Sequence, residues 1–251
     1  MPRKLGQHFL IRDSVLERLA TAACHDHPSR VIEIGPGRGA LTRHLLPKVA
    51  ELHAIELDPT LVAYLEEKFA GEPNLTVHHL DVLQANLAEW GPAVIAGNLP
   101  YYITSPIIDR FLELDAAAFP SAVFLIQWEV AERLLAMPHT RAYGYLTVKT
   151  QLACDVQLVC RVPPGAFLPP PKVDSAGVRL VRKQDALAYP EGLVMFVGRC
   201  FAHKRKTLRN NLKAFYPAEA LEALPEAGLR AEQISVPQFV DLWRRLSPVT
   251  K

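Results

Sequence analysis

The sequence predicts an α/β protein, in which a domain with a mostly parallel sheet covered by helices is followed by a small helical domain. Up to about residue 182, apolar β-rich segments alternate with amphipathic ones, which is typical of strands joined by crossover helices. Beyond that residue only helical segments follow. A chain of 251 residues can hold one large and one small domain, so the domains are expected at 1–182 and 183–251.

Each expected strand is a short apolar run that ends at or near a glycine, an acid or an amide. The strands are expected at 30–35, 51–57, 74–81, 92–99 and 121–127. The segments between them have apolar residues at helical spacing, and Pro59 suits a first helical turn. Helices are expected at 39–48, 59–70, 105–115 and 128–137, and in the second domain at 191–203, 205–215, 217–226 and 236–246. The proline-dense segment 162–173 predicts a stiff loop.

Composition excludes several classes of protein. Hydrophobic residues at 49% and charged residues at 22% are ordinary for a folded soluble protein. No uninterrupted apolar run is long enough to span a membrane, and no export signal is visible, so a cytoplasmic protein without a membrane partner is expected. The four cysteines (24, 154, 160 and 200) lack CxxC spacing, so they are expected to be reduced, with no metal site.

Positive charge gathers near the C-terminus, although the net charge is only +2. Residues 183–251 carry 11 basic and 7 acidic side chains, and the segment 199–213 has no acid at all. Such a cluster indicates either contact with a polyanion or a solvated helix face. The candidates for contact with the phosphates of such a polyanion are Arg199, Lys204, Arg205, Lys206 and Arg209, together with Arg3, Lys4 and Arg12 near the N-terminus.

A glycine-rich loop follows the first expected strand in IEIGPGRGALT, residues 32–42. Gly35, Gly37 and Gly39 lie between strand and helix, where missing side chains let a ligand approach the backbone. Glu56 lies 21 residues after Gly35, at the end of the second strand, where a carboxylate can accept hydrogen bonds from ribose hydroxyls. The loop therefore indicates a nucleoside cofactor, but its letters fit a dinucleotide as well.

A second acid favours one cofactor over the other. Asp81 follows the third strand at the same edge, where it can accept a hydrogen bond from an adenine amino group or cap a turn. Asn98 ends the fourth strand, and no proton-handling pair suited to hydride transfer is evident. The arrangement suits S-adenosyl-L-methionine (S-adenosylmethionine) better than NAD.

The stretch GNLPYYIT, residues 97–104, indicates the reacting group. The Asn98 side-chain oxygen and the Leu99 carbonyl can each accept one N–H of an adenine N6, which favours a pyramidal nitrogen able to attack a methyl group. Pro100 would hold that carbonyl, and Tyr101 could stack on the purine. This chemistry needs positioning and electrostatics but no obligatory side-chain base. The alternative is a plain turn with Tyr101 packed in the core.

The chain closely resembles the small-subunit ribosomal RNA adenine N6,N6-dimethyltransferase family. The shared motifs are LGQHFL (5–10), EIGPGRGALT (33–42), IELD (55–58), GNLPYYIT (97–104), EVAERL (129–134), FLPPPKVDSAGVRL (167–180) and KRKTLRNNL (204–212). The resemblance implies a Rossmann-like class I methyltransferase domain and a small helical C-terminal domain for RNA binding. It implies dimethylation of N6 of two adjacent adenosines near the 3′ end of small-subunit rRNA, and a role in small-subunit biogenesis.

The resemblance also implies roles for individual residues. His8 and Leu10 fall where an N-terminal segment, here 1–12, closes over the cofactor, and the other cofactor-binding positions are Gly35, Gly37, Glu56, Asp81 and Asn98. The expected partner is the small ribosomal subunit, bound by a monomer. Two positions depart from the family pattern. Trp128 stands where a lysine is expected, which either removes a phosphate contact or adds a stacking surface, and Gly177 replaces a β-branched residue in a strand.

The residues leave three other functions as alternatives. A methyltransferase of large-subunit rRNA that confers antibiotic resistance shares NLPY and the cofactor motifs, but KRKTLRNNL and the proline loop argue against it. An NAD-dependent enzyme is disfavoured by NLPY. The third alternative is a protein without catalytic activity that binds immature ribosomal subunits as an assembly factor. Because every proposed catalytic position is present, such binding is expected in addition to catalysis.

Overall fold

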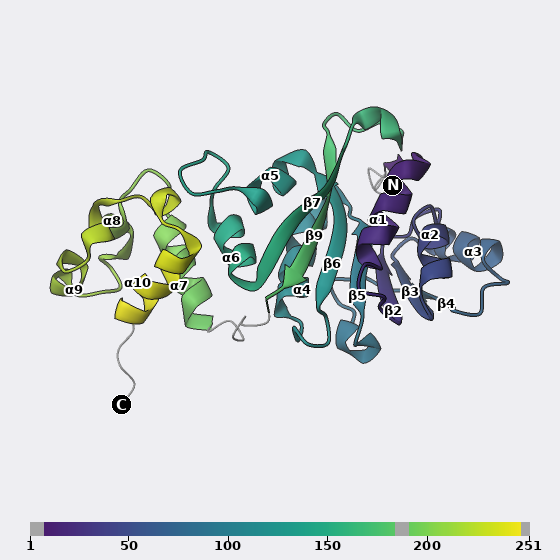
Figure 1. The fold of residues 1–251 in the computed structure, drawn as a ribbon, viewed down its shortest axis with the longest axis horizontal. Helices are drawn as coiled ribbons and strands as arrows, with labels where there is room; N and C mark the ends of the chain where they lie inside the picture. The colour runs from purple at the N-terminus through teal and green to yellow at the C-terminus, as the bar shows by residue number, and fades with distance from the viewer. Residues whose placement is uncertain (1–7, 184–190, 247–251) are drawn as a thin grey trace. The chain divides into compact units, whose positions relative to one another are not determined.

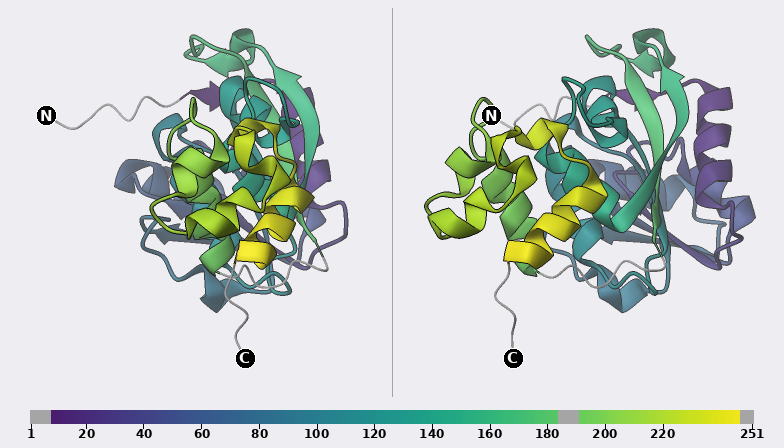
Figure 2. Two further views of the ribbon diagram at one scale, coloured as in Figure 1. Left: turned by 90° about the vertical axis from the view of Figure 1, so that its left-hand side faces the viewer. Right: turned by 60° about the vertical axis from the view of Figure 1, so that its left-hand side comes forward.

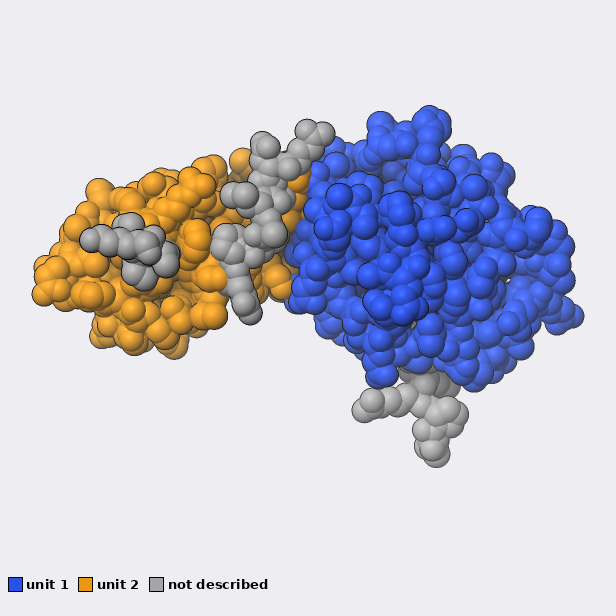
Figure 3. Space-filling model, turned by 90° about the horizontal axis from the view of Figure 1, so that it is seen from below, with its two compact units in different colours: residues 1–131, 155–182 blue, residues 132–154, 183–251 orange. Residues whose placement is uncertain are grey.

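The computed structural model describes residues 8–183 and 191–246 and divides into two compact units (Figure 3). Unit 1 consists of residues 1–131 and 155–182, and unit 2 of residues 132–154 and 183–251. This division differs from the predicted domains, because residues 132–154 group with the C-terminal helices. The reason is burial, since Tyr143 and Val148 lie in the apolar core of those helices and not against the sheet.

Unit 1 is built around a sheet with the strand order β4-β3-β2-β5-β6-β9-β7 (Figure 1). The first five strands in this order run parallel to one another, and β9 pairs antiparallel with β6. The strands are β2 (Arg30–Ile34), β3 (Glu51–Glu56), β4 (Leu75–His79), β5 (Val94–Asn98), β6 (Ser121–Gln127), β7 (Cys154–Val162) and β9 (Ser175–Arg182). The predicted α/β class with a mostly parallel sheet is confirmed, whereas β7 was not predicted and β9 was expected only as a strand that contains Gly177.

Helices cover both faces of this sheet. Helix α1 packs on one face, where its leucines share a core with Val94, Val123 and Leu125 of β5 and β6 (Figures 1 and 2). Phe111 of α4 meets Phe124 edge to face on the opposite side. The helices of unit 1 are α1 (Asp13–Ala23), α2 (Thr42–Leu45), α3 (Pro59–Lys68), α4 (Thr104–Glu113) and the start of α5 (Trp128–Leu135), with short 3₁₀ turns η1 (Leu46–Lys48), η2 (Leu87–Trp90), η3 (Tyr101–Ile103) and η4 (Pro164–Ala166).

The direction in which successive strands are added to the sheet reverses between β2 and β5. From β2 the chain proceeds outward through β3 and β4, and then returns to the other side of β2 with β5 and β6. In open parallel sheets such a reversal leaves a crevice at the carboxyl ends of the two strands. The crevice here lies between the loop after Ile34 and the residues after Asn98.

Unit 2 is a group of helices around an apolar core of its own (Figures 1 and 2). Its elements are α6 (Tyr145–Ala153), α7 (Glu191–Phe201), α8 (Leu208–Leu212), α9 (Ala218–Glu222), η5 (Pro225–Gly228), η6 (Ala231–Gln233) and α10 (Val236–Leu246). The helix predicted at 205–215 was too long, because Thr207 is extended and its side chain accepts from Asn210 N, which starts α8 at Leu208. Within the described residues, no helix is long and apolar enough to cross a bilayer.

Candidate active site

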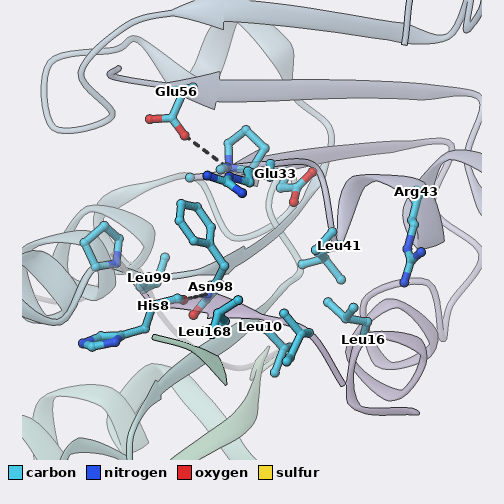
Figure 4. A pocket seen from close by; sticks show the side chains of 18 of the residues that line it. His8, Leu10, Leu16, Glu33, Leu41, Arg43, Glu56, Asn98, Leu99 and Leu168 are labelled. Carbon is cyan, nitrogen blue, oxygen red and sulfur yellow. Dashed lines mark hydrogen bonds between the residues drawn. The ribbon is translucent and has the colours of Figure 1, made fainter. Parts of the chain in front are cut away.

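A cavity of about 520 Å³ opens at the carboxyl ends of β2, β3 and β5 (Figure 4). A volume of this size is ordinary for a site that binds a small molecule. Nine of the predicted site residues line it, namely His8, Leu10, Gly35, Gly37, Glu56, Asn98, Leu99, Pro100 and Tyr101. The structure thus brings together residues that are spread over almost a hundred positions of sequence.

The glycine loop forms the wall that follows β2. Gly35, Gly37 and Gly39 have φ angles of +65°, +58° and +73°, a region in which residues with a Cβ are strained. At Gly37 an added Cβ would also lie 3.1 Å from the Phe9 ring. The loop therefore needs glycine for its backbone shape as well as for access to the cavity.

Glu56 ends β3 with a carboxylate held by backbone amides. One oxygen, Oε1, accepts from Leu57 N at 2.9 Å and from Asp58 N at 3.0 Å, while Oε2 accepts from Gly37 N at 3.1 Å. Only 5% of the residue is exposed. Since each carboxylate oxygen can accept two hydrogen bonds, Oε2 retains capacity for one ribose hydroxyl.

Asp81 lies in a smaller cavity beside the main one, and both cavities are lined by Gly35, Glu56 and Pro100. Asp81 follows β4 by two residues, and its Oδ1 accepts from Leu83 N at 2.9 Å. The turn-capping alternative is thus present in the structure, and the second carboxylate oxygen remains for a ligand in the smaller cavity.

Asn98 lies where β5 reaches the cavity. Its Nδ2 donates to the carbonyl oxygen of His8 at 3.2 Å (Figure 4). A carbonyl can only accept, so this bond fixes the amide with Oδ1 as the acceptor. Leu99 is 1% exposed and donates its N–H to Leu125 O, which anchors the backbone ahead of Pro100.

Tyr101 is held from two sides. Its hydroxyl shares a hydrogen bond of 2.8 Å with Ser175 Oγ, and the His8 ring lies 5.7 Å from its ring at an angle of 28°. Burial raises the pKa of the Tyr101 phenol above its ordinary value of 10. The hydroxyl is therefore neutral at physiological pH, and the ring is the part of Tyr101 that is suited to contact a ligand.

The N-terminal segment forms one wall of the cavity. Strand β1 (Phe9–Leu10) pairs antiparallel with β8 (Phe167–Leu168) of the proline-dense segment. The His8 ring also bonds through Nδ1 to Pro169 O at 2.8 Å, and Leu10 is buried in the core of unit 1. Both β1 and β8 contribute residues to the cavity lining, whereas the closing role implied for residues 1–12 stays a prediction.

Glu33 is a cavity residue that the sequence reasoning missed. It is 1% exposed in β2, and its Oε2 accepts from Thr42 Oγ1 at 2.6 Å. Burial, aided by the nearby negative charge of Glu56, raises the pKa of Glu33 to about 7 against the opposing effect of the Thr42 bond. The signal in the sequence is an acid between the apolar residues Ile32 and Ile34, two residues before Gly35.

Glu33→Gln is expected to stabilise the unliganded protein at alkaline pH. Because the folded pKa lies above the unfolded one, the wild-type protein loses stability as pH rises from about 4.5 to about 7, and the neutral amide does not. The variant's advantage should reach on the order of 3 kcal/mol at pH 8 and vanish near pH 4. Denaturant unfolding of both proteins across this pH range tests the prediction. A difference in the free energy of unfolding that does not change with pH contradicts it.

The predicted RNA contacts that the structure describes lie in two places. Lys204, Arg205, Lys206 and Arg209 are exposed in unit 2, the first three in the loop between α7 and α8. Asn211 steadies this loop by donating to Cys200 O and His203 O. Arg199 differs, since its guanidinium lies 4.2 Å from the Phe215 ring.

Outside unit 2, Arg12 is exposed before α1, whereas Arg3 and Lys4 lie outside the described residues.

The departure at Gly177 has a steric reason. An added Cβ would lie 2.6 Å from Leu19 Cδ2 and 3.3 Å from Cys160 Sγ, so neighbouring side chains already fill the space of a β-branched residue.

The cavity fits S-adenosylmethionine in size and chemistry. It offers the Glu56 carboxylate for one ribose hydroxyl, a glycine loop with room for a nucleoside, and apolar walls from Leu10 and Leu41. Among the described residues, no group of three or more His, Cys, Asp or Glu is placed to hold a metal ion.

Comparison with known proteins identifies the family. The model of the ribosomal RNA adenine dimethylase family matches residues 1–247. Ribosomal RNA small subunit methyltransferase A of Picosynechococcus sp. is 39% identical, covering 100% of this chain and 99% of that protein. The protein of the same name from Acidobacterium capsulatum is 40% identical over 97% of this chain and 90% of its own length.

Solved structures give the same result. A dimethyladenosine transferase from Plasmodium falciparum has a TM-score of 0.84 at 29% identity, covering 94% of this chain and 96% of its own. The 23S rRNA methyltransferase ErmE has a TM-score of 0.73 at 32% identity, covering 95% of this chain and 99% of its own. With the cavity's fit to S-adenosylmethionine, these matches show that the chain belongs to the ribosomal RNA adenine dimethylase family, a class of S-adenosylmethionine-dependent enzymes.

Proposed function

We propose that the protein transfers methyl groups from S-adenosylmethionine to N6 of two adjacent adenosines near the 3′ end of small-subunit (16S) rRNA, giving N6,N6-dimethyladenosine. The observation that carries this proposal is the Asn98 amide, which lines the cavity and donates from Nδ2 to His8 O, so that Oδ1 is the amide atom left to accept. An acceptor beside a nucleoside-sized cavity is what an adenine amino group needs.

The chain's own residues act by positioning. Oδ1 of Asn98 and the carbonyl of Leu99 accept from the two N6–H bonds, which concentrates the nitrogen lone pair on the side away from them. S-adenosylmethionine, when bound, supplies an electrophilic methyl group. The amino group loses a proton to water after methylation, so no side-chain base is required. Pro100 and the Leu99–Leu125 hydrogen bond keep the two acceptors in place.

Tyr101 supplies a surface for the target base. One side of its ring is occupied by the His8 ring, so the adenine stacks on the opposite side or replaces His8. The bond from the Tyr101 hydroxyl to Ser175 fixes the ring before the base arrives. Preorganisation of this kind lowers the cost of holding an unstacked base.

The small ribosomal subunit is the proposed partner, bound by a monomer in the cytoplasm, with a further role in subunit biogenesis. Full-length relatives near 40% identity are named for the small subunit. ErmE supports large-subunit rRNA as a second candidate, at a lower identity. Offering undermethylated small subunits and large subunits separately, with labelled methyl donor, discriminates the two. Label in large-subunit rRNA alone would favour the second.

Glu56→Ala is expected to weaken S-adenosylmethionine binding by on the order of 1–3 kcal/mol, because the ribose loses its acceptor. The Gly37, Leu57 and Asp58 amides also lose theirs, so part of the effect comes from the glycine loop. Calorimetric titration of the cofactor measures it. Wild-type affinity in Glu56→Ala would remove Glu56 from the cofactor site.

Replacing Lys204, Arg205 and Lys206 together with Ala is expected to weaken small-subunit binding and to flatten its dependence on salt. Each lost phosphate contact removes one released counterion from the salt slope. Cofactor affinity should not change, since these side chains are exposed in unit 2 and the cofactor cavity is lined by unit 1. Binding assays from low to high salt test it, and an unchanged slope means that these charges only solvate the loop.

A further inference from the structure

A stacked pair of side chains stands at the carboxyl end of β6. Trp128 directly follows this strand, and the guanidinium carbon of Arg161 lies 4.3 Å from the centre of its ring. Asp174 holds the guanidinium at its edge, with Nε at 2.9 Å and Nη2 at 2.8 Å from Oδ2. The Arg161 side chain nevertheless remains 57% exposed.

Short contacts join this pair to the proposed target site. Trp128 N donates to Asp174 O at 2.9 Å, and the preceding residue, Gln127, pairs with Ser175 across the ladder. Ser175 Oγ in turn bonds to the Tyr101 hydroxyl at 2.8 Å. The Trp128–Arg161 pair is therefore tied to the ring of Tyr101 through two adjacent residues of one strand end, Asp174 and Ser175.

The chemistry of the pair favours a flat, neutral ligand. Asp174 offsets the positive charge of Arg161 and occupies the guanidinium edge that would otherwise grip a phosphate. The part of Arg161 that remains for a ligand is the flat face of its guanidinium, which the stacking on the Trp128 indole holds in place. Unpaired bases stack on aromatic rings and on arginine planes of this kind.

We propose that Trp128 and Arg161 form a stacking surface for the unpaired base next to the adenosine held at Tyr101. This inference rests on the proposed function, in which the target adenosine has an adenosine neighbour. Holding the neighbour in place fixes the strand while one adenosine is in the site. Of the two consequences considered for Trp128 from the sequence, the geometry favours the stacking surface.

The test pairs changes in the protein with changes in the RNA. Small subunits carry uridine in place of one or the other target adenosine, and single-turnover methylation of the remaining adenosine is measured. With wild-type protein, the uridine that removes the stacked neighbour should lower kcat/KM several-fold, because a pyrimidine stacks less strongly. With Trp128→Leu, native subunits should already react about tenfold more slowly in kcat/KM, and uridine should add little further loss.

Matched variants exclude a loss that arises from charge or folding. Arg161→Lys keeps the charge but removes the plane and should resemble Trp128→Leu, while Trp128→Phe should retain most of the coupling. The thermal unfolding and the cofactor affinity of the Trp128 and Arg161 variants should equal those of the wild-type protein.

If the loss of kcat/KM from Trp128→Leu and the loss from the uridine are independent and add in free energy, the stacking surface is wrong, but the proposed function is unaffected. Absence of methylation of native subunits by the wild-type protein overturns the proposed function itself, and the inference with it.

Discussion

Asn98→Ala is expected to lower the single-turnover rate of small-subunit methylation by a hundredfold or more, while RNA binding changes little. The Asn98 oxygen acts mainly in the transition state, where it stabilises the N6–H bonds of a nitrogen that is becoming positive. Losing one such preorganised acceptor costs on the order of 3 kcal/mol. The bond from Nδ2 to His8 O shows that the amide is oriented before any substrate binds.

Two variants of Tyr101 provide the comparison. Tyr101→Phe keeps the ring and should stay active, because the phenol is neutral and its partner is Ser175. Tyr101→Ala removes the stacking surface and should cost roughly 1–3 kcal/mol in base binding. Rates near wild type for Asn98→Ala would mean that GNLPYYIT is a turn without a catalytic role, and an inactive Tyr101→Phe would give the hydroxyl a part in the reaction.

Gly97→Ala is expected to destabilise unit 1 and to distort the site next to it. An added Cβ at Gly97 would lie 2.4 Å from the carbonyl oxygen of Ile34, which belongs to the neighbouring strand β2. Backbone cannot rotate away as a side chain can, so β2 and β5 must separate at the edge where Gly35 and Asn98 line the cavity. Overpacking of this kind costs typically 1–3 kcal/mol.

Gly71→Ala is the matched control, since an added Cβ there meets nothing within 4 Å. Denaturant unfolding should show a loss for Gly97→Ala and almost none for Gly71→Ala, and calorimetry should show weaker cofactor binding only in the former. Equal stability of the two variants would mean that β2 and β5 tolerate the extra methyl group.

The position of the site could be predicted from the sequence because it depends on local patterns. Parallel strands bring their carboxyl ends to one edge, so Gly35, Glu56 and Asn98 were expected together, and the structure places all three on one cavity. These features need only the strand order and the residue that ends each strand.

Contacts between distant segments could not be predicted in this way. The pairing of β1 with β8 and the bond from Tyr101 to Ser175 join residues that are 74 or more positions apart, and no periodicity records them. The same holds for residues 132–154, whose apolar side chains gave no indication of which core they would join. Glu33 was missed because an acid inside a strand reads as an interruption of the apolar pattern, whereas burial beside Thr42 sets its properties.

The most direct test of the proposed reaction is to incubate the protein with labelled S-adenosylmethionine and undermethylated small subunits, and then to map the modified nucleosides in the rRNA by mass spectrometry. We expect N6,N6-dimethyladenosine at two adjacent adenosines near the 3′ end, with four methyl groups transferred per subunit at completion, two to each adenosine. Label confined to another nucleotide, or to large-subunit rRNA when both subunits are offered, would contradict it.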